Sequence, residues 1–95
     1  MTQAALKQTA LNASAATAEL VARILTRFPQ AQIRPRSLPM SDEDISLEVV
    51  LPMTMEEIYR AREWIYDVVI ELQERYDVLI LASAVPQEER TNATS

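Results

Sequence analysis

The chain contains no cysteine, no histidine and no glycine among its 95 residues. Without cysteine it has no disulfide, no thiol nucleophile and no thiolate metal site. Without histidine it lacks the commonest general base and the commonest metal ligand. Without glycine it cannot form the phosphate loops of P-loop and dinucleotide-binding proteins, in which the backbone approaches the phosphate closely. These absences exclude the commonest kinds of active site, and we expect no bound cofactor.

Basic residues are also scarce. The chain has 9 Lys and Arg against 14 Asp and Glu, a formal net charge of -5, and its basic residues are scattered without a run. This balance argues against binding to nucleic-acid phosphates. No apolar run is long enough to cross a membrane, and the first residues lack the basic start and apolar core of a signal peptide. We therefore expect a cytoplasmic protein that binds neither nucleic acid nor membrane.

The length predicts a single small domain. Residues 1–16 form an alanine-rich start that is helical or frayed, residues 17–85 a single α+β domain, and residues 86–95 a disordered polar tail. A chain this short buries a smaller share of its surface than a longer one, so its core is limited. Self-association is a natural supplement to such a core.

Two helices are predicted. Residues 3–28 have good helix propensity and end at Pro29, with an apolar face of Val21, Ile24, Leu25 and Phe28 that Ala18 and Leu11 extend. The second helix follows Thr54, which forms a capping box with Glu57. Its apolar residues have the three-four spacing of a core-facing stripe: Ile58, Ala61, Ile65, Val68, Val69, Leu72 and Tyr76.

Three strands are predicted beside these helices. Residues 31–40 contain Pro35 and Pro39, which cannot donate ladder hydrogen bonds, so this strand lies at an edge or is bulged. Residues 44–52 alternate, with Ile45, Leu47, Val49 and Leu51 on one face. A third apolar run covers residues 77–86. The order α-β-β-α-β predicts an α+β fold, in which a three-stranded mixed sheet has two helices packed on one face and its last two strands are parallel.

Two aspartates separated by one residue, Asp42 and Asp44, precede the alternating strand. Acidic and small residues are typical of a turn before an exposed strand. Asp77, at the junction of the second helix and the third strand, has the same simple explanation. The turn interpretation predicts no catalytic and no metal-binding residue.

The segment Ser41–Leu47 and the later Asp77–Ile80, in this order of helices and strands, resemble the small nucleotidyltransferases of the polymerase-beta superfamily. The resemblance spans roughly residues 17–84. It implies that Asp42 and Asp44, together with a third carboxylate on the neighbouring strand, hold magnesium for nucleotide transfer.

The family also places a Gly-Ser pair against the triphosphate. This chain has no glycine, and its nearest candidate is Arg36–Ser37. The alternative to a non-enzymatic domain is therefore a nucleotidyltransferase-like protein with a magnesium-binding Asp-x-Asp, inactive or dependent on a partner chain.

The second helix carries a further stripe. Tyr59, Tyr66 and Ile70 lie well away from its core stripe, and Trp64 projects nearer the charged face. Tyr and Trp are favoured interface anchors, so these four residues are candidate partner-binding residues. The alternative is that the first helix packs broadly and covers Tyr59 and Tyr66.

The third strand supports the partner interpretation. Residues 78–81, Val-Leu-Ile-Leu, are apolar on both faces, which implies cover on both sides although the helices can cover only one. We therefore predict a small non-enzymatic domain that acts through protein association, as a homodimer or as an accessory subunit.

Overall fold

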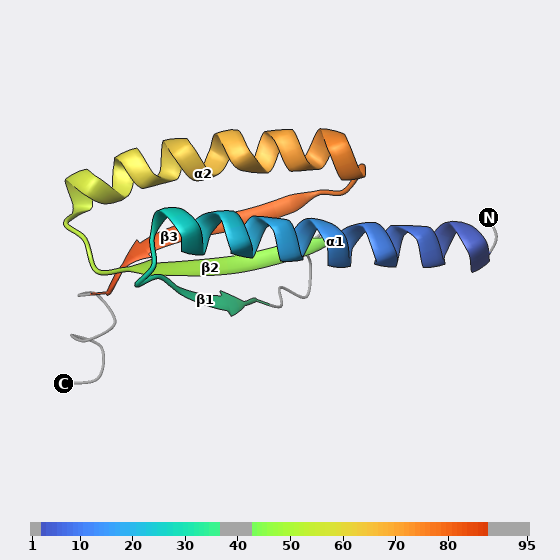
Figure 1. Ribbon diagram of the computed structural model, residues 1–95, viewed down its shortest axis with the longest axis horizontal. Helices are drawn as coiled ribbons and strands as arrows, with labels where there is room; N and C mark the ends of the chain where they lie inside the picture. Colours follow the sequence, from blue (N-terminus) through green and yellow to red (C-terminus); the bar gives the residue numbers. More distant parts are fainter. Residues whose placement is uncertain (1–2, 37–42, 88–95) are drawn as a thin grey trace.

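The computed structural model describes residues 3–36 and 43–87. Its elements are α1 (Gln3–Arg27), β1 (Gln32–Pro35), β2 (Ile45–Leu51), α2 (Met55–Tyr76) and β3 (Ile80–Pro86). This confirms the predicted order and the α+β class. Both helices lie on the same side of the sheet (Figure 1). Outside the described residues lie Ser37, Pro39, Ser41, Asp42 and residues 88–95 of the polar tail expected from residue 86; Pro86 itself is the last residue of β3.

The sheet has the strand order β1-β2-β3. β1 pairs with β2 antiparallel, and β2 pairs with β3 parallel, with Ile45 opposite Ile80 and Leu51 opposite Pro86. β1 is a short edge strand, as its prolines predicted. The Arg36 amide donates to the Ser46 carbonyl at 2.8 Å, so the neighbouring Pro35 faces away from β2. A proline is tolerated there because no ladder bond is lost.

β2 is the central strand of the sheet, and its side chains on the helix-covered face belong to the core. Ile45, Leu47, Val49 and Leu51 are all buried on the face that the helices cover, as the alternation predicted. Val50 is also buried, on the opposite face of the sheet. The strand thus contributes apolar side chains to both faces near its end.

α2 begins and packs as its sequence predicted. The Thr54 hydroxyl accepts a hydrogen bond from the Glu57 amide at 3.3 Å, and the Glu57 carboxylate accepts one from the Thr54 amide at 3.0 Å. The buried residues of the helix are Ile58, Ala61, Ile65, Val68, Val69 and Leu72, and Tyr76 is partly buried against the same core. The helix ends at Asp77, which has a left-handed backbone (φ 54°), a conformation that Asp tolerates better than most residues.

Replacing Thr54 by Ala should lower the free energy of unfolding by about 1 kcal/mol, because the first turn of α2 loses its cap. Thr54→Ser keeps the hydroxyl and is the matched control, with stability close to that of the wild type. Urea unfolding followed by circular dichroism measures both. An Ala variant as stable as the Ser variant would show that the box does not stabilise the helix.

The predicted core face of α1 is partly wrong. The fully buried residues are Ala16, Leu20 and Ile24, at spacings of four, whereas Leu25 is 40% and Leu11 61% exposed. Ala18 is exposed as well. Leu25 follows Ile24 by one residue, about 100° around the helix, and therefore points away from the core. The alanine-rich start is helical from Gln3 and continuous with the rest of α1, and its first turns extend past the end of α2 (Figure 1).

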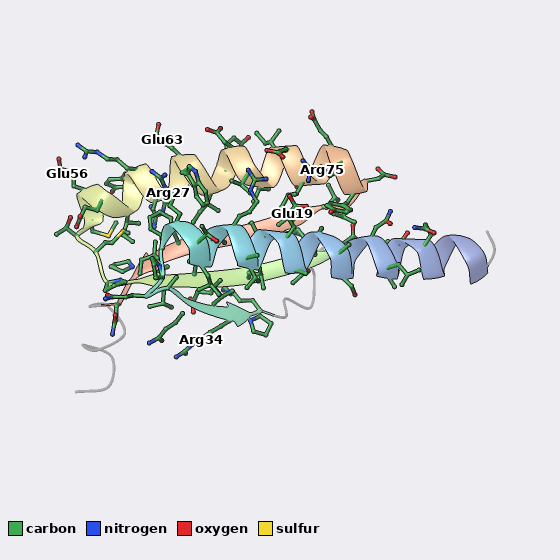
Figure 2. The ribbon with its side chains drawn as sticks, in the orientation of Figure 1. Glu19, Arg27, Arg34, Glu56, Glu63 and Arg75 are labelled. Atoms are coloured by element: carbon green, nitrogen blue, oxygen red, sulfur yellow. The ribbon has the colours of Figure 1, made fainter. Side chains whose placement is uncertain are left out.

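A group of polar side chains joins the two helices. The Arg75 guanidinium lies 2.7 Å from the Glu19 carboxylate, and the Tyr76 hydroxyl donates to that carboxylate at 2.8 Å. Arg23 of α1 pairs with Glu71 of α2 at 3.1 Å. Figure 2 shows Glu19 and Arg75 facing one another between the helices. We call Glu19, Arg23, Glu71, Arg75 and Tyr76 the interhelix cluster.

The interhelix cluster predicts a loss of stability in acid. The hydrogen bonds from Tyr76 and Arg75 lower the pKa of Glu19, and the hydrogen bond from Arg23 lowers that of Glu71. A carboxylate whose pKa is lower in the folded chain stabilises the fold above its unfolded pKa, and this stabilisation is lost as the pH falls through the folded pKa. We therefore expect the urea midpoint to fall as the pH drops below about 4.5, the ordinary value. Glu19→Gln should flatten that profile, whereas Glu63→Gln, outside the cluster, should leave its shape unchanged.

Candidate functional site

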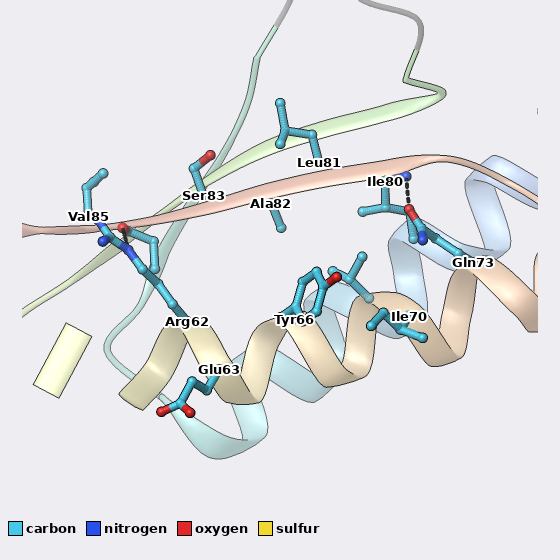
Figure 3. Close-up of a pocket in the computed structure, with 12 residues that line it drawn as sticks. Arg62, Glu63, Tyr66, Ile70, Gln73, Ile80, Leu81, Ala82, Ser83 and Val85 are labelled. Atoms are coloured by element: carbon cyan, nitrogen blue, oxygen red, sulfur yellow. Dashed lines mark hydrogen bonds between the residues drawn. The ribbon is translucent and has the colours of Figure 1, made fainter. Parts of the chain in front are cut away.

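A groove runs between α2 and the free edge of β3. It has a volume of about 580 Å³ and is lined on one side by Arg62, Tyr66, Ile70 and Gln73 of α2, and on the other by residues 80–85 of β3. Figure 3 shows these side chains along the groove; Arg62 reaches β3 at one end of the groove and Gln73 reaches it at the other. This groove is the candidate site for a partner.

The strand edge in this groove exposes backbone polar groups. The Leu79 carbonyl accepts from the Ile45 amide at 3.1 Å, so the carbonyl of Leu79 faces β2. Because backbone groups alternate along a paired strand, those of Leu81, Ser83 and Val85 face β2 as well. The backbone groups of Ile80, Ala82 and Ala84 therefore face the groove.

Two of these groove-facing groups are bound by side chains of α2. The Gln73 side-chain carbonyl accepts from the Ile80 amide at 2.9 Å. The Arg62 Nε donates to the Ala84 carbonyl at 3.1 Å. Ala82 lies between these two contacts and is half-buried. Unpaired strand edges of this kind are a template for pairing with another chain.

The exposed face of α2 at the groove carries apolar side chains beside the polar Arg62, Glu63 and Gln73. Tyr66 is 64%, Tyr59 58% and Ile70 36% exposed. The alternative in which α1 covers Tyr59 and Tyr66 is therefore wrong, because α1 lies along the other flank of α2. The Arg62 guanidinium lies over the Tyr59 ring, 5.5 Å from its centroid. Three of the four candidate partner-binding residues thus share one exposed face of α2.

The fourth candidate, Trp64, lies elsewhere. It is partly buried and packs edge-to-face on Phe28, the residue that follows α1, with ring centroids 5.6 Å apart. The Arg27 guanidinium lies 5.1 Å from the Trp64 ring. Trp64 lies about 100° around α2 from the buried Ile65. This places its side chain on the flank of α2 that faces α1, away from the groove. In the folded chain it helps to hold the two helices together.

Arg62, Gln73 and Ala82 were missed as site residues. Arg62 and Gln73 precede and follow Tyr66 by four and seven residues, so helical spacing places them on the same face. That spacing was the available signal. Their bonds to β3, however, depend on the packing of α2 against a strand that follows it, which spacing alone does not reveal.

The structure shows which residues of the apolar run 78–81 are covered. Val78 and Ile80 are 4% and 7% exposed and face the core, whereas Leu79 is 53% exposed. The strand begins only at Ile80, so Val78 and Leu79 precede it. Leu81 is half-buried on the open face of the sheet. The run therefore alternates, and complete cover of its outer side is not required.

Asp44 and Asp77 have structural roles. The Asp44 carboxylate accepts from the Leu79 amide at 2.9 Å and ties the start of β2 to the chain just before β3. Asp77 forms the left-handed end of α2. Within residues 3–36 and 43–87, no three His, Cys, Asp or Glu side chains are grouped so that they could hold a metal ion. Asp42 lies outside these residues.

Neither helix in the described part of the chain is both long and apolar enough to cross a membrane.

Comparison of the chain with models of protein families, with curated proteins and with solved structures finds no match. The resemblance to the nucleotidyltransferases therefore stays a prediction from the sequence.

Proposed function

We propose that this chain is a non-enzymatic domain that acts through protein association, as a homodimer or as an accessory subunit. Its association surface is the face of α2 formed by Tyr59, Arg62, Tyr66, Ile70 and Gln73, together with the groove-facing backbone of residues 80–84. We call this the edge surface. In this proposal the protein works in the cytoplasm, without nucleic acid, membrane or cofactor.

The observation that carries the proposal is an open strand edge beside exposed apolar side chains. Backbone groups at Ala82 offer directional hydrogen bonds, and Tyr66 and Ile70 offer apolar area next to them. Strand addition uses this combination, because main-chain bonds give affinity and neighbouring side chains give specificity. Tyrosine is also enriched among residues that dominate binding energies.

The two edges of the sheet differ in a way that supports this choice. β1 has only four residues, and Pro35 faces outward with no amide hydrogen to offer. Short length and outward proline are devices that prevent a strand edge from pairing. β3 has seven residues, and its Pro86 stands only at the end. The edge of β3 is thus the one that the sequence leaves able to pair over several residues.

Light scattering at micromolar concentration tests the proposal. We expect a dimeric mass for the wild type and a monomeric mass for the double variant Tyr66→Glu with Ile70→Glu, because two charges would enter an apolar contact. The matched control is Leu11→Glu with Leu25→Glu, which changes two exposed residues of α1 and should stay dimeric. A monomeric wild type would contradict self-association, and a dimer that resists the Tyr66 and Ile70 changes would place the interface elsewhere.

A further inference from the structure

We propose that the partner at the edge surface is a second copy of the chain, whose β3 pairs antiparallel with the first β3 around a two-fold axis at Ala82. The inference rests on the proposed function and specifies its partner and geometry. The two sheets would then join into one continuous sheet, with the two α2 helices side by side across the axis.

The backbone register follows from which groups face the groove. In an antiparallel pair centred on Ala82, Ala82 lies opposite Ala82 of the second copy, and the two residues exchange amide and carbonyl bonds. Ile80 then lies opposite Ala84 of the second copy. The Ile80 amide would meet that Ala84 carbonyl, and the Ala84 amide would meet the Ile80 carbonyl.

The two side-chain bonds to β3 match this register. Gln73 binds the Ile80 amide and Arg62 binds the Ala84 carbonyl, and these two backbone groups are the mutual partners in the two-fold pairing. In the single chain, the side chains therefore satisfy a donor and an acceptor that the second copy would otherwise satisfy. On pairing, backbone bonds replace both contacts and free Arg62 and Gln73.

The same two contacts fix the level of α2 against β3. Arg62 lies beside Ala84 and Gln73 beside Ile80, so Ala82 lies level with a point about midway between Arg62 and Gln73. Rotation about Ala82 therefore brings Tyr66 of one copy to the level of Ile70 of the other. These exposed side chains would form an apolar centre, as interfaces commonly have.

Charges at the ends of this contact are complementary. The rotation places Arg62 opposite Gln73 and Glu74 of the second copy, and Glu63 opposite the neutral Gln73. Once released from the Ala84 carbonyl, Arg62 can pair with Glu74 across the axis. The pairing occurs twice by symmetry and sets the register, because a shifted register would separate these charges.

The arrangement is closed. Each copy contributes the same surface, so the two-fold contact uses both β3 edges and leaves only the two β1 edges at the ends of the sheet. Pro35 faces outward on each β1. Further strand addition is thus disfavoured, and the expected particle is a dimer rather than a filament.

Ala82→Pro is the principal test. Its amide faces the groove and not β2, so proline there removes edge pairing without removing a ladder bond to β2. We expect a monomeric mass by light scattering with an unchanged circular dichroism spectrum, and a dimeric mass for the control Ala82→Ser. A folded Ala82→Pro variant that stays dimeric would overturn the β3 pairing while leaving association itself standing. A monomeric wild type would overturn both.

Engineered thiols test the register even where the proline variant fails to fold. The chain has no cysteine, so each introduced thiol is unique. Leu81 lies opposite Ser83 of the second copy in a pair with Cα atoms about 4.5 Å apart, within the range that a disulfide bridges. Oxidation of a mixture of Leu81→Cys and Ser83→Cys should give a covalent heterodimer faster than either variant alone gives a homodimer. Equal rates would overturn the register.

Exchange of the end charges tests the helix contact. Arg62→Glu and Glu74→Arg should each weaken the dimer ~tenfold or more, and the double exchange should restore most of its affinity. Sedimentation over a range of concentrations measures all three. Failure of the double exchange to recover affinity, in a folded variant, would show that Arg62 and Glu74 do not meet across the axis.

Discussion

Truncation of Leu47 or Ile65 to alanine should lower the free energy of unfolding by about 2–5 kcal/mol in each case. Leu47 lies at the centre of β2, and Ile65 lies at the middle of the core stripe of α2, with 6% and 2% of their surface exposed. Each change removes apolar contact and leaves a cavity between strand and helix. The expected loss is a large part of the roughly 5–15 kcal/mol that stabilises a typical domain.

Urea unfolding at one fixed protein concentration measures these losses, because the proposed dimer would make the measured stability depend on concentration. Met55→Ala is the control, since Met55 is 42% exposed at the start of α2 and its loss should change stability by no more than about 0.5 kcal/mol. A neutral Leu47→Ala would mean that β2 lies with its other face toward the helices.

Leu20→Ala should be comparably destabilising, by about 2–5 kcal/mol. Leu20 is fully buried and, with Ala16 and Ile24, forms the line along which α1 packs on the rest of the chain. The loss should appear in the same cooperative transition as that of Ile65, because α1 completes the core.

Leu11→Ala is the matched control within the same helix. Leu11 is 61% exposed, so its truncation should change the free energy of unfolding by no more than about 0.5 kcal/mol. The comparison also separates the observed core face of α1 from the predicted one, which included Leu11 and Leu25. A large effect at Leu11 together with a small one at Leu20 would reverse that assignment.

The sequence predicted α2 and β2 well because their signals are redundant. α2 has a capping box and a stripe of apolar residues that face the same way, and β2 alternates from Ile45 to Val49 before Val50 adds an apolar residue to its other face. α1 offered no such signal. Its packing face includes Ala13 and Ala16, whose small side chains contribute little to an apolar pattern. The larger Leu11 and Leu25, which are exposed, therefore shifted the predicted face away from the observed one.

The sequence predicted the helical residues of the candidate site but not their contacts with β3. The spacing of Tyr59, Tyr66 and Ile70 identified a second face on α2, because that property belongs to one helix. The contributions of Arg62 and Gln73 belong to two elements at once, since both side chains bind the backbone of β3. Trp64 illustrates the same limit, because its environment is set by Phe28 at the end of α1.

The parallel pairing of β2 with β3 has a consequence for the order of folding. Asp44 and Leu79, which meet where these strands begin, are 35 residues apart in the chain, whereas β1 and β2 are neighbours in sequence. Distant pairings carry a larger loop-closure cost and therefore form late. We expect β3 to dock last, onto the edge of β2 whose backbone groups have until then been unpaired. In the proposed dimer, the strand edge that pairs is therefore completed by the final folding step, and we expect dimerisation to follow folding rather than to compete with it.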